Sequence, residues 1–119
     1  MGCSNSSDNS SIDKVVVMKV DFELETFVAV SCDNFESVFE KEMKIIEITE
    51  QEKLNQLNLL VKDLKIDKDN YIPDVRAKAI IYFSDGQKDT LCISSLGVLF
   101  NRKSMLQSTQ IVKFIGEAH

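Results

Sequence analysis

The sequence is poor in the residues that most often carry catalysis. It has no tryptophan, two tyrosines, one proline and a single histidine, His119, which is its last residue. General acid–base and nucleophilic sites usually depend on a histidine held in a fixed geometry, whereas a terminal histidine is usually mobile. We therefore expect no Ser-His-Asp or Cys-His site, and the sequence predicts a protein that is not an enzyme.

Motifs for cofactors and metals are also missing. The four glycines are scattered, so neither a dinucleotide-binding nor a P-loop pattern is present. The three cysteines stand far apart, at Cys3, Cys32 and Cys92, without the close spacing of a zinc site. The run "DKDNYIPDVRAK" begins like a calcium loop, but Ile72 replaces the required glycine and Lys78 the final glutamate. We expect no cofactor and no metal.

The charge and hydropathy of the chain argue against nucleic-acid binding and against a membrane-spanning helix. The formal net charge is −5, and such an acidic chain is ill suited to phosphate backbones, so we expect no nucleic-acid partner. No stretch approaches the roughly 18 apolar residues of a membrane-spanning helix. Any contact with a membrane would therefore depend on an attached lipid.

The first half of the chain predicts strands and helices in alternation. Apolar residues alternate with charged ones from Val16 to Leu24, which is typical of a half-buried strand, and the β-prone run "TFVAVS" follows. In "CDNFESVFEKE", Asp33 and Glu36 resemble a capping box, and the run predicts one or two helical turns. The next run, "MKIIEIT", predicts a short strand. Thr49 and Glu52 form a capping box ahead of leucines at helical spacing, which predicts the longest helix.

The second half predicts a hairpin around Asp85-Gly86. A two-residue type I′ turn at this dipeptide would place Tyr82 opposite Asp89 and Ala79 opposite Cys92. A second short hairpin follows, with "NR" in its turn, and a last helix lies in "QIVKFIGEA".

The resulting order, β-α-β-α-β-β-β-β-α, predicts an α+β fold. We expect a mainly antiparallel twisted sheet of five to six strands that ends in a meander, with two to three helices packed on one face. Residues 1–13 are too polar to join a core and are expected to form a disordered tether. Residues 14–119 are expected to form a single domain.

The Asp-Gly hairpin has apolar residues on both faces, which leaves two interpretations open. Either both faces are covered within the chain, or one face meets a partner. For the second case we expect an interaction surface at the end of the hairpin that contains Tyr82, Asp85 and Asp89. In an oxidising compartment, Cys32 and Cys92 are candidates for a disulfide.

The N-terminus "MGCSNSSDNSS" resembles the processing site of bacterial lipoproteins. In that family a small residue precedes the lipidated cysteine, and a flexible polar tether leads to the domain. The resemblance implies that Gly2 precedes the cut, that Cys3 bears the lipid and that the protein lies in the bacterial cell envelope, although the usual upstream apolar segment is missing. The same residues are similar to the start of myristoylated and palmitoylated eukaryotic proteins. An unmodified, cytoplasmic start is the third interpretation.

These observations predict a small cell-envelope lipoprotein domain that acts by binding an unknown protein. One alternative is an enzyme inhibitor or immunity-type protein that blocks a basic cleft, which a cluster of acidic residues would favour. That cluster would contain Asp21, Glu23, Glu25 and Asp89. A second alternative is a hydrolase that uses two carboxylates of raised pKa in a deep pocket.

Overall fold

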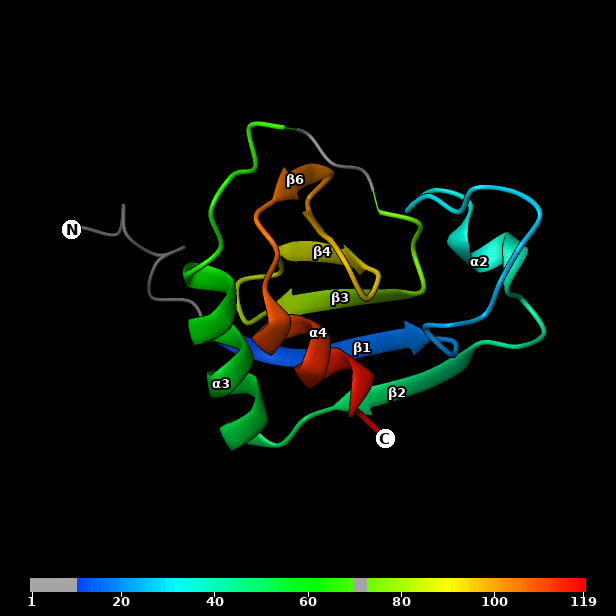
Figure 1. The fold of residues 1–119 in the computed structure, drawn as a ribbon. Helices are drawn as coiled ribbons and strands as arrows, with labels where there is room; N and C mark the ends of the chain where they lie inside the picture. The colour runs from blue at the N-terminus through cyan, green and yellow to red at the C-terminus, as the bar shows by residue number, and fades with distance from the viewer. Residues whose placement is uncertain (1–10, 70–72) are drawn as a thin grey trace.

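A computed structural model describes residues 11–69 and 73–119 of the chain, and its fold is α+β (Figure 1). Within these residues the strands are β1 (Ile12–Lys19), β2 (Lys44–Ile48), β3 (Ala77–Phe83), β4 (Lys88–Ile93), β5 (Val98–Phe100) and β6 (Lys103–Met105). The helices are α2 (Phe35–Val38), α3 (Gln51–Lys62) and α4 (Thr109–Gly116). This order of strands and helices is the one that the sequence predicts.

The strands form one antiparallel sheet in the order β2-β1-β3-β4-β5-β6. β1 lies between β2 and β3, so the chain must cross β1 to pass from β2 to β3, and α3 lies in that crossing. Strands β3 to β6 form the predicted C-terminal meander. β1 begins at Ile12, two residues before the expected start of the domain.

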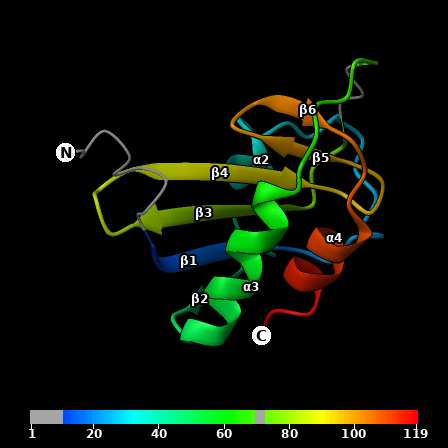
Figure 2. The same cartoon turned by 90° about the vertical axis from the view of Figure 1, so that its left-hand side faces the viewer.

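Helices α3 and α4 cover one face of the sheet, as Figure 2 shows. Leu57 of α3 and Ile111 of α4 are fully buried in the same apolar cluster as Val15 and Val17 of β1. At roughly 25 cal/mol for each Å² of apolar surface removed from water, such contacts supply most of the driving force for packing the two helices. The main core of the domain therefore lies between this face and the two helices.

The opposite face of the sheet is covered at one end by the segment that joins β1 to β2. This segment, residues 20–43, is called the β1–β2 connection below, and it contains α2. Phe35 of α2 and Phe39, which follows the helix, are buried and pack with Met18 of β1 and Cys92 of β4. At this end, the apolar residues on the second face are covered within the chain.

The β3–β4 hairpin differs from its expected register by one residue. Tyr82 pairs with Lys88 and Ala79 with Leu91, because the loop has three residues, 84–86, in place of two. Gly86 has φ +90° and its N–H donates to the carbonyl of Phe83, as in a turn closed by a bulge. The prediction of a two-residue turn was wrong because only the glycine adopts positive φ.

The two-residue turn with two positive φ angles occurs instead between β5 and β6. Asn101 and Arg102 have φ 49° and 70°, and the flanking residues Phe100 and Lys103 pair. Asn101 also accepts a hydrogen bond from the N–H of Thr90 at 2.8 Å through its side-chain oxygen. The asparagine side chain thus ties this turn to β4 and helps it to hold a conformation that few residues favour.

Several local expectations for the first half of the chain were wrong. β1 ends at Lys19, and Asp21 starts a turn by accepting the N–H of Glu23 at 2.9 Å. The run "TFVAVS" is not a strand, and the expected capping residue of α3, Thr49, is replaced by Glu50 without a side-chain cap. The short α2 begins after Asn34, also without a side-chain cap.

We predict that Gly86→Ala lowers the free energy of unfolding by about 1 kcal/mol, because a β-carbon disfavours positive φ. A β-carbon built at this position meets no atom within 4 Å, so the cost comes from the backbone alone. Urea unfolding of Gly86→Ala and Gly86→Asn gives the measurement and its control, since asparagine tolerates this conformation better. Equal stability of Gly86→Ala and the unmodified protein would contradict the assigned turn.

Candidate interaction site

A disulfide between Cys32 and Cys92 fastens the β1–β2 connection to the centre of the sheet. The two Cα atoms lie 5.8 Å apart, and Cys92 is fully buried in β4. The bond joins residues 60 positions apart in the sequence and thus closes a long loop. The pairing that the sequence left open for an oxidising compartment is therefore present in the structure.

Lys78 forms a second attachment next to this disulfide. It pairs with Cys92 across β3 and β4, so its side chain lies on the same face as the connection. Its ammonium nitrogen donates to the carboxylate of Glu36 at 3.0 Å and to the carbonyl of Cys32 at 3.1 Å. A largely buried cation needs such partners, and Lys78 therefore holds both α2 and the cysteine in place.

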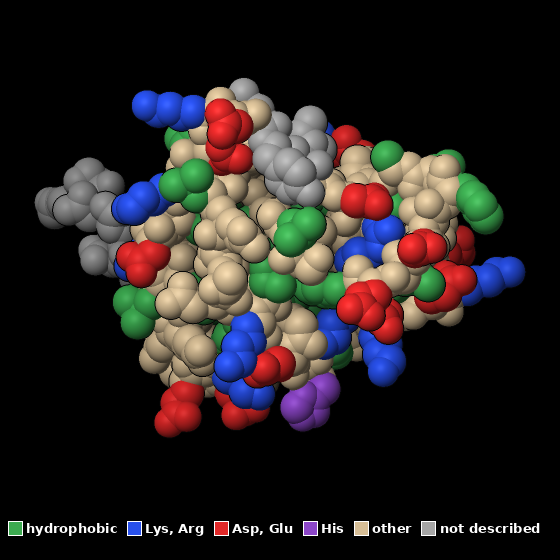
Figure 3. All heavy atoms as spheres, in the orientation of Figure 1, with side chains coloured by type: hydrophobic (Ala, Val, Ile, Leu, Met, Phe, Trp, Pro, Cys, Tyr) green, Lys and Arg blue, Asp and Glu red, His purple; other side chains and the backbone are tan. Residues whose placement is uncertain are grey.

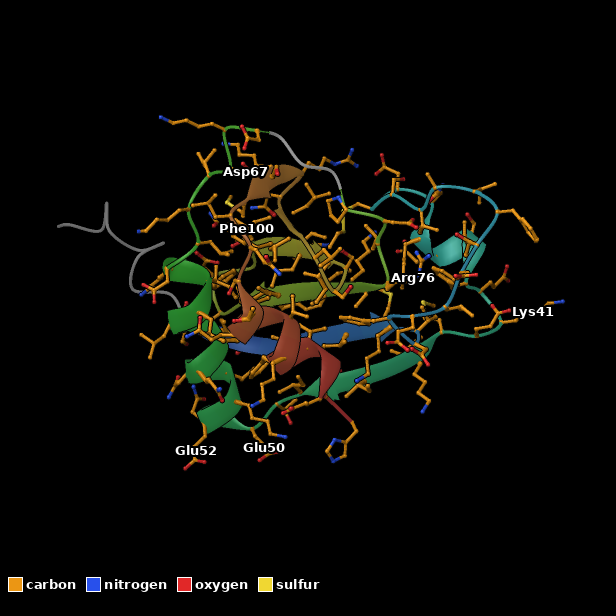
Figure 4. The ribbon with its side chains drawn as sticks, in the orientation of Figure 1. Lys41, Glu50, Glu52, Asp67, Arg76 and Phe100 are labelled. Atoms are coloured by element: carbon orange, nitrogen blue, oxygen red, sulfur yellow. A yellow bond between two sulfur atoms is a disulfide. The ribbon has the colours of Figure 1, made fainter. Side chains whose placement is uncertain are left out.

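Arg76, labelled in Figure 4, and Asp74 hold the two stems of a loop within the connection through hydrogen bonds. The buried Arg76 donates from Nε to the carbonyl of Leu24 at 2.7 Å and from Nη2 to Asp74 at 3.1 Å. Asp74 accepts the N–H of Val30 at 2.8 Å, and Val75 donates its N–H to the carbonyl of Val30. Burial raises the pKa of the Asp74 carboxyl, but the hydrogen bonds from Val30 and Arg76 outweigh this effect and leave the pKa below its usual value.

Between these two stems the chain exposes an apolar tip, residues 25–29. Phe27 is fully exposed and Val28 is more than half exposed, and Leu24 is partly exposed at the adjoining stem. The hydroxyl of Thr26 donates to the carbonyl of Val28 at 2.6 Å and stabilises the turn of the tip. A fully exposed phenylalanine beside other exposed apolar residues is typical of a contact surface.

The β1–β2 connection also contains the whole net negative charge of the protein. It has seven acidic residues and one basic residue, Lys41, whereas the other 95 residues contain 12 acidic and 13 basic ones. Two of the seven pair with the sheet: Glu36 with Lys78, and Asp33 with Arg102. The other five are exposed and make no ion pair within the described part of the chain: Asp21, Glu23, Glu25, Glu40 and Glu42. Acidic and hydrophobic side chains lie together at this end of the molecule (Figure 3).

The expected surface residues at the β3–β4 hairpin are not brought together. Tyr82 lies on the second face between Lys14 and Lys88, whose nitrogens are 5.1 and 5.8 Å from the ring centroid. Asp89 pairs with Ile81 and therefore points to the opposite face, where it accepts a hydrogen bond from Asn101 at 3.0 Å. Asp85 accepts the N–H of Gln87 within the turn. The one-residue change in register separates Tyr82 from Asp89.

Lys19, at the end of β1, is a titratable group outside the connection with a shifted pKa. Its ammonium nitrogen donates to the carbonyls of Ile115, Gly116 and Ala118, which lie at the C-terminal end of α4. Burial, and then the positive charge of Lys44, lower the pKa of Lys19. Lys19 acts as a C-terminal cap of α4, because its ammonium group donates hydrogen bonds to carbonyls at the end of the helix.

Within residues 11–69 and 73–119 no cluster of His, Cys, Asp and Glu is arranged to hold a metal, and none of the helices could span a membrane. Cys3 and the rest of the expected lipid-attachment motif lie outside the described residues. The fold and site thus define an α+β domain with a disulfide-anchored, exposed loop. No family model, curated protein or solved structure matches the chain.

The tip was not predicted as a site, because "TFVAVS" is β-prone and was expected to form a strand, either after a bend or bulge near Thr26 and Phe27 or as a second strand. Two signals were present in the sequence: the alternation of apolar residues breaks near Thr26 and Phe27, and acidic residues concentrate between positions 20 and 43. Together they distinguish an exposed connection from a core strand.

We predict that the free energy of unfolding of the double variant Cys32→Ala/Cys92→Ala is about 2–4 kcal/mol lower than that of the oxidised protein. The reason is that the cross-link no longer restricts the unfolded chain. Urea unfolding with and without dithiothreitol is the measurement. The reductant should lower the stability of the unmodified protein and leave that of the double variant unchanged. Equal stability of the two oxidised proteins would contradict a structural role for the bond.

Proposed function

We propose that the protein is a non-catalytic binding domain of the bacterial cell envelope, and that it contacts another protein through the tip of the β1–β2 connection. The observation that carries this proposal is the fully exposed Phe27 on a loop held by a disulfide and by a buried arginine. Aromatic residues on rigid supports are typical centres of binding energy in protein interfaces. The disulfide supports an oxidising compartment, and the N-terminal resemblance supports a lipid on Cys3.

A second candidate is an inhibitor or immunity-type protein. It is favoured by the three acidic residues around the tip, which occupy one short stretch of the connection: Asp21, Glu23 and Glu25. The fourth acidic residue expected in this cluster, Asp89, lies in β4 and takes no part in it. An acidic, protruding loop suits the entrance of an enzyme whose active-site cleft is basic.

We predict that Phe27→Ser disrupts a complex that the protein forms in its own cells. Truncating a central aromatic contact typically costs at least about 2 kcal/mol, or about 30-fold in affinity. The protein is extracted in mild detergent and its size is measured by size-exclusion chromatography with immunodetection. The unmodified protein should elute as a complex, and Phe27→Ser as the 13.5 kDa chain with any lipid.

Leu59→Ser is the matched control, because Leu59 is an exposed apolar residue on α3. It should elute with the unmodified protein. If Phe27→Ser also elutes as the complex, the tip is not the contact surface and the proposal fails.

We predict that Cys3 is acylated in the native protein. Intact-mass spectrometry of protein extracted from membranes should show the added mass of a diacylglycerol with an N-acyl chain, after loss of the residues that precede Cys3. Added masses of one myristoyl chain on Gly2 and one palmitoyl chain on Cys3 would indicate the dual-acylation alternative. An unmodified mass in the soluble fraction would contradict the envelope location.

A further inference from the structure

We infer that the partner presents an apolar pocket rimmed by lysine or arginine, and that the tip of the β1–β2 connection inserts into it with Phe27 foremost. This inference rests on the proposed function and adds the chemistry of the partner. The proposed partner is a different protein with such a surface. The experiment below distinguishes it from a second copy of this chain and from a lipid surface.

The apolar part of the partner site follows from the shape of the tip. Phe27 is fully exposed, and the exposed Leu24 and Val28 lie three residues before it and one residue after it in the chain. Phe27 and Val28 belong to the five-residue tip and Leu24 to its adjoining stem, so these apolar side chains stand on one short loop and not on the face of a sheet or helix. A concave apolar pocket is the surface that would remove the ring and its neighbours from water.

The basic rim follows from the charge of the connection that bears the tip. Glu23 and Glu25 flank Leu24, and Glu40 and Glu42 follow α2 on the same connection. Their carboxylates make no ion pair with described residues, and the single lysine of the connection, Lys41, leaves most of the charge uncompensated. Charges at the edge of an interface select partners of opposite charge and accelerate association.

The same charge disfavours the other two occupants. A second copy would bring two tips of the same strongly negative charge together, and an anionic lipid surface would repel them. The described connection has one basic residue, Lys41, and Arg76, which reaches the stem of the tip, is buried and hydrogen-bonded to Asp74 and Leu24. A basic protein surface is therefore the occupant that the described residues favour.

The anchoring of the stems reduces the cost of such an insertion. The carbonyl of Leu24 and both backbone groups of Val30 are already hydrogen-bonded to residues 74–76. Because the stems are ordered before binding, little backbone entropy is lost when the tip enters a pocket. The structure thus presents Phe27 in a largely prepared geometry.

The test uses p-benzoylphenylalanine in place of Phe27 in the full chain, expressed in the cells that make the protein. Irradiation should cross-link the chain to a second protein, and peptide mapping should place the cross-link beside a pocket that carries lysine or arginine. The same probe at Leu59 on α3 is the control and should give no such product.

Two charge variants then separate this inference from the proposed function. Glu23→Gln/Glu25→Gln should reduce the cross-linked yield at low salt several-fold, and Glu52→Gln/Asp63→Asn, with the same change in charge on and just after α3, should leave the yield unchanged. A product that both variants leave unchanged would overturn the basic rim while the proposed function stands. No product, or products only with lipid or with a second copy, would overturn the inference and the proposed contact through the tip.

Discussion

The attachment of the β1–β2 connection to the sheet is the constraint on which the rest of the candidate site depends, and the Cys32–Cys92 bond is its centre. The closed loop of about 60 residues restricts the unfolded chain, which corresponds to about 4 kcal/mol in the chain-entropy account. The bond also places Cys32 where its carbonyl accepts from Lys78. A connection of 24 residues with a single short helix has little secondary structure of its own, so its position is set largely by these contacts.

Two cations supplement the covalent bond, and both come from the start of one strand. Arg76 precedes β3 and Lys78 is its second residue, so the two side chains reach different parts of the connection. Each is largely buried and would be costly to leave unpaired, and each binds a backbone carbonyl of the connection as well as a carboxylate. The same short stretch of sequence therefore stabilises the sheet and fixes the β1–β2 connection.

The parts of the fold that sequence could predict are those that depend on local pattern. The leucine spacing of α3 and the order of elements follow from local sequence patterns, and the sequence indicated the turn at Asn101-Arg102 correctly. The register of the Asp85-Gly86 hairpin could not be obtained in this way. Loops of two and three residues both accept this dipeptide, and the choice depends on packing across the sheet. The sequence contains signs of an irregular acidic connection near Phe27, but the anchoring of its stems could not be predicted, because it depends on contacts between residues about 50 positions apart.

The arrangement of β1 links the two ends of the proposed function. β1 starts at Ile12 beside the β3–β4 turn, where Ser84 donates its N–H to the carbonyl of Ser11, and it ends at Lys19 where the connection begins (Figure 1). Eight residues at about 3.3 Å each separate these points by roughly 25 Å. A lipid on Cys3 would attach the domain on the side of Ile12, and the tip lies beyond the far end of the strand. The membrane anchor and the contact loop would therefore act at opposite ends of the sheet, and a partner could bind the tip without displacing the domain from the membrane.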